Sequence, residues 1–282
     1  MTRLLTFTLF VLLSLPTVTL AQKTIAEDAT SLPAGWIHAP SRLQNPGLWN
    51  CASYGGSWVV SDDGGSISLV RFGAESKSSK QSPLPPQLKL SKKMVGRRLL
   101  QPTLSGWLAG FDAGEFGGGL WWFSGDGLKT IELLSENVHA IYQIEKDILI
   151  LTGLNHMGLN YGHAYKFDDT SGKVTVTLVT DLGGSPEAAT VNSGDNIIVA
   201  TRDRVLRVHK DGKANEMYKS GEHLTYPTSA AVDANGVVYV AMRFFVLRLV
   251  PQEASAYNAE WLMPEQCRVF KLEKYICGCE TK

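Results

Sequence analysis

The chain has 282 residues, with 27 basic and 27 acidic side chains and a formal net charge of zero. This balance gives no global electrostatic attraction for nucleic acids, so we expect no nucleic-acid partner. The length is sufficient for one large all-β domain.

The first 21 residues have the features of an export signal. Arg3 supplies a positive start, residues 4–15 form an apolar run, and residues 19–21 are a candidate cleavage site. The run is too short for a good membrane span, although an anchor or a buried N-terminal helix is the alternative. We therefore expect a mature chain of residues 22–282, periplasmic or secreted, and of bacterial rather than other origin.

Five short β-type runs recur along the mature chain. Each follows another β-rich run, and Gly, Asp and Asn separate the runs, as hairpin turns require. The runs are spaced by 51, 44, 41 and 41 residues and cover 69–72, 120–123, 164–167, 205–208 and 246–249.

The last two runs belong to an internal repeat. Residues 185–208 and 226–249 align at an offset of 41, with nine of 24 positions identical. A repeat of about 40 residues made of short strands is typical of propeller blades.

Each unit reaches four strands when a first strand and an outer strand are added. First strands are expected at 188–191 and 229–232, and outer strands at 129–134 and 174–179. We predict an all-β propeller of five four-stranded blades forming a single domain. Residues 30–50 and 264–276 either complete a blade from both ends of the chain or add a sixth. A sandwich of two sheets is the other architecture, but it does not predict the repeat.

Four cysteines follow the export signal: Cys51, Cys267, Cys277 and Cys279. Disulfides persist in exported proteins, and a bond between the last two, which are one residue apart, is strained. The favoured pairing joins Cys51 to one of the other three, which belong to a tail at about 264–282. Such a bond closes the ring covalently. Free or locally bridged thiols are the alternative, and the sequence does not select the pairing.

The second copy of the repeat carries a family resemblance. This copy resembles blades of the NHL-repeat and gluconolactonase-type propeller superfamily. The resemblance lies in Pro227, Ala231, Val232, Asp233, Gly236 and the run 238–241. The resemblance implies the fold, and the superfamily includes metal-dependent lactonases, lyases and binding proteins. The lactonase type implies a divalent ion on the axis held by Glu, Asn and Asp, and Glu187 matches the glutamate. Its asparagine and aspartate partners have no assigned position here.

Strand direction predicts which face of the propeller carries a site. In an antiparallel four-stranded blade, the loop between the second and third strands lies on the same face as the connection that leads into the next blade. The connecting segments add His139, Glu187, His223 and Tyr226 to that face. Polar groups and glycines that converge on one rim suit a binding site. The candidate ligand-binding residues are Asp62, Asp63, Asp112, Glu115, Asn155, His156, Asn160, Tyr161, His163, Arg202 and Arg243.

Each group of candidates also has a structural interpretation. The acidic side chains are suited to calcium binding or acid–base chemistry, or they simply form turns. His156 and His163 could bind a metal, but they could equally be exposed residues of a loop at 153–163. Arg202 and Arg243 occupy equivalent places, where they could bind an anion or support the blade edges.

Residues 76–98 contain seven basic residues, three prolines and no acidic residue. We interpret this segment as a solvated linker and edge strand, because Lys and Pro at an edge discourage aggregation. Contact with an anionic envelope surface is the functional alternative.

The chain contains no nucleophile elbow, phosphate loop, zinc-protease helix or dinucleotide fingerprint. The favoured hypothesis is an exported, non-catalytic propeller that binds a protein, a glycan or a small ligand on the predicted rim. The alternative is a metal-dependent lactonase, hydrolase or lyase with calcium or zinc near the axis and Glu187 as a ligand. The sequence leaves the ligand, the presence of catalysis and the oligomeric state open, and a monomer is the simplest expectation.

Overall fold

The structure, a computed structural model, describes residues 31–52, 55–73, 83–221, 224, 226–253, 256–268, 270–273 and 276–279. Residues 32–282 form one compact unit, which is the unit described below. The predicted export signal lies outside the described residues.

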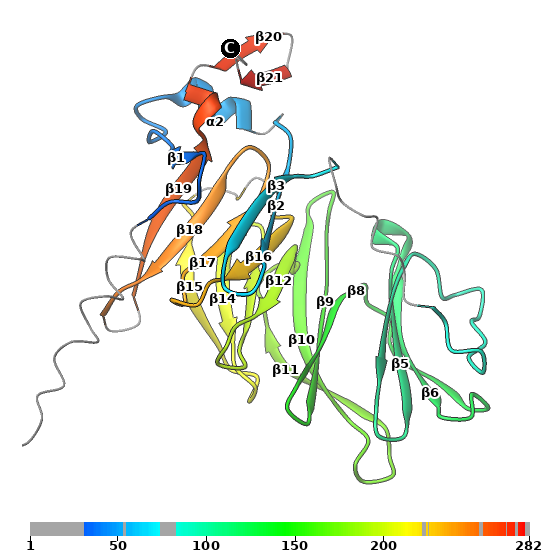
Figure 1. The fold of residues 1–282 in the computed structure, drawn as a ribbon. Coiled ribbons are helices and arrows are strands. Elements are labelled where there is room, and N and C mark those ends of the chain that lie inside the picture. Colours follow the sequence, from blue (N-terminus) through cyan, green and yellow to red (C-terminus); the bar gives the residue numbers. More distant parts are fainter. Residues whose placement is uncertain are drawn as a thin grey trace, which may run out of the picture. The chain divides into compact units, whose positions relative to one another are not determined.

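Four sheets, each of four or five antiparallel strands, account for most of this unit (Figure 1). Sheet I contains β4 (Arg97–Pro102), β5 (Gly106–Asp112), β6 (Gly118–Ser124) and β7 (Thr130–Leu134). Sheet II contains β8 (Val138–Ile144), β9 (Asp147–His156), β10 (Leu159–Asp168) and β11 (Thr175–Asp181). Sheet III contains β12 (Ala188–Val191), β13 (Ile197–Ala200), β14 (Arg204–Val208) and β15 (Ala214–Lys219). Sheet IV contains β16 (Ser229–Val232), β17 (Val238–Ala241), β18 (Val246–Pro251) and β19 (Tyr257–Pro264).

Sheet IV gains a fifth strand from the other end of the chain. Strand β1 (Trp36–His38) pairs antiparallel with β19, and Trp36 lies opposite Pro264. Residues far apart in the chain thus share one sheet, but β1 adds a fifth strand to four that are already present, and β20 (Phe270–Glu273) pairs with β21 (Ile276–Cys279) in a separate hairpin. A two-stranded sheet of β2 (Trp58–Asp62) and β3 (Ile67–Arg71) follows in the chain.

Neighbouring sheets contact each other through their first strands. Strand β8 is contacted by β4 and β5. Strand β16 is contacted by β12 and β13, and β2 is contacted by β16 and β17. Separate apolar clusters fill the spaces between sheets I and II, II and III, and III and IV. The fold is all-β, with 53% strand and 5% helix. It is consistent with a β-propeller, in which face-to-face packing buries sheets that are apolar on both sides.

Strand β13 shows how the sequence produces this packing. Ile197 and Val199 point into the cluster shared with sheet II, whereas Ile198 and Ala200 point into the cluster shared with sheet IV. All four residues are fully buried. Successive side chains of a strand face opposite sides, so a continuous apolar run buries both faces of the sheet.

The segment that precedes β4 is packed rather than solvated. Leu88 and Met94 are buried and pack with Phe111 and Phe123 of sheet I, on the face opposite the cluster shared with sheet II. The prediction of a solvated linker was therefore wrong for the apolar side chains of residues 83–94, although the lysines of this stretch are exposed. Residues 74–82 lie outside the described part of the chain.

A short helix, α2 (Pro46–Ala52), was not predicted. Its start has a recognisable signal, because the Asn45 side chain accepts a hydrogen bond from the Leu48 backbone N–H at 3.1 Å and a proline occupies the first helical position. In the described part of the chain, no helix is long and apolar enough to cross a membrane.

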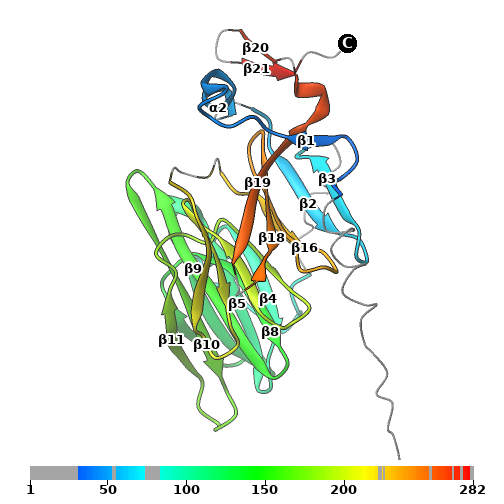
Figure 2. The ribbon, with the colours of Figure 1, turned by 90° about the vertical axis from the view of Figure 1, so that its left-hand side faces the viewer.

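The elements that carry the cysteines lie together. Helix α2, which contains Cys51, contacts β21 (Ile276–Cys279), and β21 also contacts the 3-10 helix η3 (Glu265–Arg268) (Figure 2). Strand β21 forms a hairpin with β20 (Phe270–Glu273). Cys267, in η3, is buried. The pairing of the cysteines stays a prediction.

Candidate functional site

A pocket of about 530 Å³ lies between the first strands of sheets I to IV. Pockets of this size accommodate small organic ligands. Its walls are formed by Arg97, Leu99, His139, Ala140, Ile141, Tyr142, Pro186, Glu187, Ala188, Ala189, Thr228, Ser229 and Ala230.

The polar groups of the pocket come from equivalent places in successive sheets. Arg97 is the first residue of β4 and His139 the second of β8, while Glu187 and Thr228 immediately precede β12 and β16. Each sheet therefore contributes at least one polar side chain near the start of its first strand, and sheet IV also contributes Ser229.

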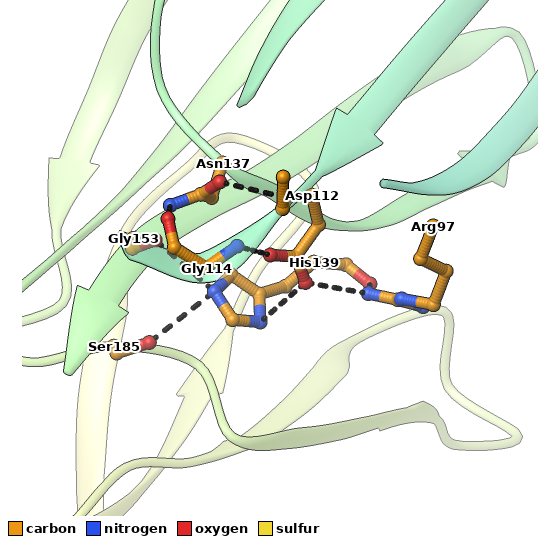
Figure 3. Close-up of polar contacts among 8 residues, drawn as sticks. Arg97, Asp112, Gly114, Asn137, His139, Gly153 and Ser185 are labelled. Carbon is orange, nitrogen blue, oxygen red and sulfur yellow. Dashed lines mark hydrogen bonds and ion pairs between the residues drawn. The ribbon is translucent and has the colours of Figure 1, made fainter. Parts of the chain in front are cut away.

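His139 is held by contacts from three directions (Figure 3). Its Nε2 lies 3.1 Å from the carbonyl oxygen of Gly153 and 3.3 Å from the Ser185 hydroxyl. Its Nδ1 lies 4.0 Å from Asp112 Oδ2. The Arg97 Nη2 donates to the His139 carbonyl at 2.8 Å and to the Asp112 carboxylate at 3.4 Å.

Ser185, His139 and Asp112 are the residue types of a hydrolytic triad, but their arrangement does not suit a nucleophile. Ser185 is 1% exposed and does not line the pocket, so a substrate there does not reach its hydroxyl. The His139 Nε2 also faces the Gly153 carbonyl, whereas a general base needs this nitrogen free to accept the serine proton. We conclude that these contacts position His139 and Arg97 in the pocket wall.

Two asparagines brace the surrounding loops. Asn137 is 4% exposed, accepts from the Ala113 backbone at 3.3 Å and donates to the Gly114 carbonyl at 2.9 Å. Asn160 accepts from the Ser185 backbone at 3.0 Å. These side chains satisfy backbone groups of neighbouring loops, which stiffens the region behind His139.

A second polar cluster is centred on Glu136. Its carboxylate accepts from Thr152 at 2.5 Å and from Tyr165 at 2.9 Å, and its Oε2 lies 2.9 Å from His163 Nδ1. Burial raises the pKa of Glu136, but these hydrogen bonds outweigh burial and bring the pKa below its usual value. Burial and the bond to Glu136 raise the pKa of Tyr165 to about 12.

The Glu136 cluster predicts an acid-sensitive contribution to stability. Because the folded-state pKa is lowered, the ionised carboxylate stabilises the fold above its unfolded pKa of about 4.3, and this contribution is lost as pH falls through the lower folded value. Urea unfolding between pH 7 and pH 3 should therefore show a smaller loss of stability for Glu136→Gln than for the wild type. Equal slopes for both proteins would contradict this assignment.

The long hairpin β9–β10 replaces the loop predicted at 153–163. Its strands continue to His156 and resume at Leu159, and Asn155 lies opposite Asn160. Alternation explains the difference, since Tyr161, His163 and Tyr165 share one face of β10 and their rings are about 6 Å apart.

Near the tip of this hairpin, the His156 Nε2 lies against the carboxylate of Glu115, in the loop between β5 and β6. The structure thus brings together candidates from two of the predicted loops. Neither residue lines the pocket.

The remaining candidates lie elsewhere. Asp62 accepts from the Gly65 backbone at 2.6 Å in the β2–β3 turn, and Asp63 is exposed in the same turn. Arg243 stacks over the Tyr226 ring at 3.8 Å, and Arg202 accepts a backbone hydrogen bond through its carbonyl.

Of the candidate ligand and metal residues named from the sequence, only Glu187 lines the pocket. His139, which was predicted on a connecting segment, lines it as well. Arg97, Thr228 and Ser229 also line the pocket but were not among the residues predicted from the sequence. The repeat carried a signal for Thr228, because the offset of 41 residues aligns it with Glu187.

The described residues do not provide a complete metal site around Glu187. Within the described ranges, no group of three or more His, Cys, Asp or Glu side chains could hold a metal ion. A divalent ion at this position would need further oxygen or nitrogen ligands.

No family model matches the sequence, and a search of curated proteins finds no match. Among solved structures, the chain is similar to a gluconolactonase from Xanthomonas campestris, with 10% identity and a TM-score of 0.38 over 70% of this chain and 64% of that one. It is also similar to virginiamycin B lyase from Staphylococcus aureus, with 12% identity and a TM-score of 0.40 over 73% and 70% of the two chains.

A third similar structure is an auxiliary nutrient binding protein from Bacteroides thetaiotaomicron, with 11% identity and a TM-score of 0.39 over 61% and 43% of the chains. The chain spans less than two thirds of this protein and of the gluconolactonase. The solved structures that match include a gluconolactonase, the type of propeller that residues 227–241 resemble.

Proposed function

We propose that this protein is a non-catalytic binding protein whose ligand is a small polar molecule held between the first strands of sheets I to IV. The observation that carries the proposal is the pocket of about 530 Å³, with Arg97, His139 and Glu187 in its walls. A concave, partly apolar site with a few placed polar groups is the usual form of a small-molecule site. The buried Ser185 and the engaged His139 support binding over hydrolysis.

The proposal includes a ring of five blades, made of sheets I to IV and the β2–β3 hairpin. The contacts of β2 with β16 and β17 support it. It also includes export, in which case the pocket meets periplasmic or extracellular solutes.

A screen of polar metabolites by thermal shift tests the binding function. We expect at least one compound to raise the melting temperature of the wild type. Arg97→Ala should weaken the affinity for that compound about tenfold, since a charged hydrogen bond is lost. Lys93→Ala is the matched control, because the Lys93 side chain is 81% exposed and does not line the pocket. A compound that binds all three proteins equally would place its site outside this pocket.

The alternative proposal is a metal-dependent hydrolase with a divalent ion at Glu187. It is favoured by the position of Glu187 in the pocket wall, where its side chain makes no hydrogen bond or ion pair within the described part of the chain. Elemental analysis of the tag-free protein and its melting temperature with EDTA test this alternative. One equivalent of calcium or zinc, a lower melting temperature with EDTA and hydrolysis of a lactone would support the enzyme.

A further inference from the structure

Two opposite charges line the pocket without pairing with each other. Both side-chain contacts of Arg97 use Nη2, so its Nε and Nη1 have no partner among the described residues. Glu187 is half-buried, and within the same ranges its carboxylate has no partner either. The two residues also form no ion pair with each other within 4.0 Å.

Three other polar side chains of the pocket wall already make contacts within the protein. The Thr228 hydroxyl donates to the carbonyls of Trp58 and Ala241, and the Ser229 hydroxyl accepts from the Val60 backbone at 2.8 Å. His139 is held by its contacts with Gly153, Ser185 and Asp112, as described above. The charged groups left for a ligand are therefore the Nε–H and Nη1–H groups of Arg97 and the Glu187 carboxylate.

We propose that the pocket binds a zwitterion, whose anionic group meets Arg97 and whose ammonium group meets Glu187. This inference rests on the binding function proposed above and names the class of ligand. The free Nε–H and Nη1–H groups of Arg97 suit an anionic group, because hydrogen bonds from a charged guanidinium to a carboxylate are short and strong. A half-buried carboxylate without a partner suits an ammonium group, because the reduced local dielectric strengthens the pairing.

The size of the pocket narrows the class further. Its volume of about 530 Å³ lies within the range of sites for drug-sized ligands. A short peptide with free ends separates its ammonium and carboxylate groups by at least one peptide unit, which suits two opposite charges that form no ion pair within 4.0 Å. The inferred ligand is therefore a di- or tripeptide with both termini free.

Calorimetric titration with unmodified di- and tripeptides, and with their N-acetylated and C-amidated forms, tests the inference. The tightest unmodified peptide should lose affinity about tenfold or more on acetylation, and similarly on amidation. In Glu187→Gln the acetylated and free forms should bind alike. In Arg97→Met the amidated and free forms should bind alike. Lys93→Ala should retain both preferences, because Lys93 lies outside the pocket.

Two results would overturn the inference. One is equal binding of free and blocked peptides by the wild type, and the other is the absence of binding by every unmodified peptide. If no peptide binds, but an uncharged metabolite binds and loses affinity in Arg97→Ala, the proposed binding function is supported. The inference that the ligand is a zwitterion is then wrong. If no compound binds, both proposals fall. Circular dichroism of each variant confirms that it is folded.

Discussion

Replacement of Phe245 by alanine should lower the free energy of unfolding by about 3–5 kcal/mol, the usual cost of removing a fully buried phenylalanine side chain. Phe245 is 0% exposed. Its ring centroid lies 4.5 Å from that of Trp49, 5.1 Å from that of Phe244 and 5.9 Å from that of Trp261. The substitution thus opens a cavity where α2 packs on sheet IV.

Urea unfolding followed by tryptophan fluorescence measures this effect, because Trp49 and Trp261 surround the cavity. The matched control is Phe116→Ala, since Phe116 is 82% exposed at the loop between β5 and β6. The control should change stability by no more than about 0.5 kcal/mol. Equal effects of the two substitutions would show that α2 does not pack on Phe245 in solution.

Replacement of Glu260 by alanine should cost about 3 kcal/mol, because it removes the carboxylate that pairs with a buried guanidinium. The Arg248 side chain is 2% exposed, and its Nη1 donates to Glu260 Oε2 at 2.7 Å. Its Nε donates to the Tyr239 hydroxyl at 3.3 Å. Burial lowers the pKa of Arg248, but its bonds to Tyr239 and Glu260 outweigh burial and raise it, so the guanidinium stays charged.

The control for this pair is Glu145→Ala. Glu145 pairs with Lys210 at 3.2 Å, but both side chains are more than half exposed, so the loss should stay below about 1 kcal/mol. Chemical unfolding of both variants at pH 7 gives the comparison. The double variant Arg248→Leu, Glu260→Leu should recover much of the lost stability, because apolar groups avoid the cost of burying a charge that has lost the Glu260 carboxylate. A double variant no more stable than Glu260→Ala would contradict this account.

The predicted strands agree with the structure where the sequence pattern depends only on neighbouring residues. The first strands expected at 188–191 and 229–232 have the same bounds in β12 and β16. The outer strand expected at 129–134 is β7, which begins one residue later. Hairpins join strands that are adjacent in sequence, so alternation and turn residues suffice to locate them.

The candidate site was predicted less completely. Both Glu187 and His139 were assigned to segments that lead into sheets; Glu187 immediately precedes β12, whereas His139 is the second residue of β8, and both line the pocket. Arg97 was assigned to a basic linker instead, because nothing in its neighbourhood distinguishes it from the lysines before it. Its role depends on Asp112 and on the His139 carbonyl, which lie 15 and 42 residues away.

By itself, the sequence determined the all-β class, the repeat of about 41 residues and most strand positions, because these depend on side-chain alternation and on turns between neighbouring residues. Only the tertiary structure decided that β1 pairs with β19, that residues 83–94 cover sheet I, and that Arg97, His139 and Glu187 line one pocket. These features join residues far apart in the chain. They depend on which apolar faces meet when the sheets pack, and a periodic pattern within one segment carries no information about its partner.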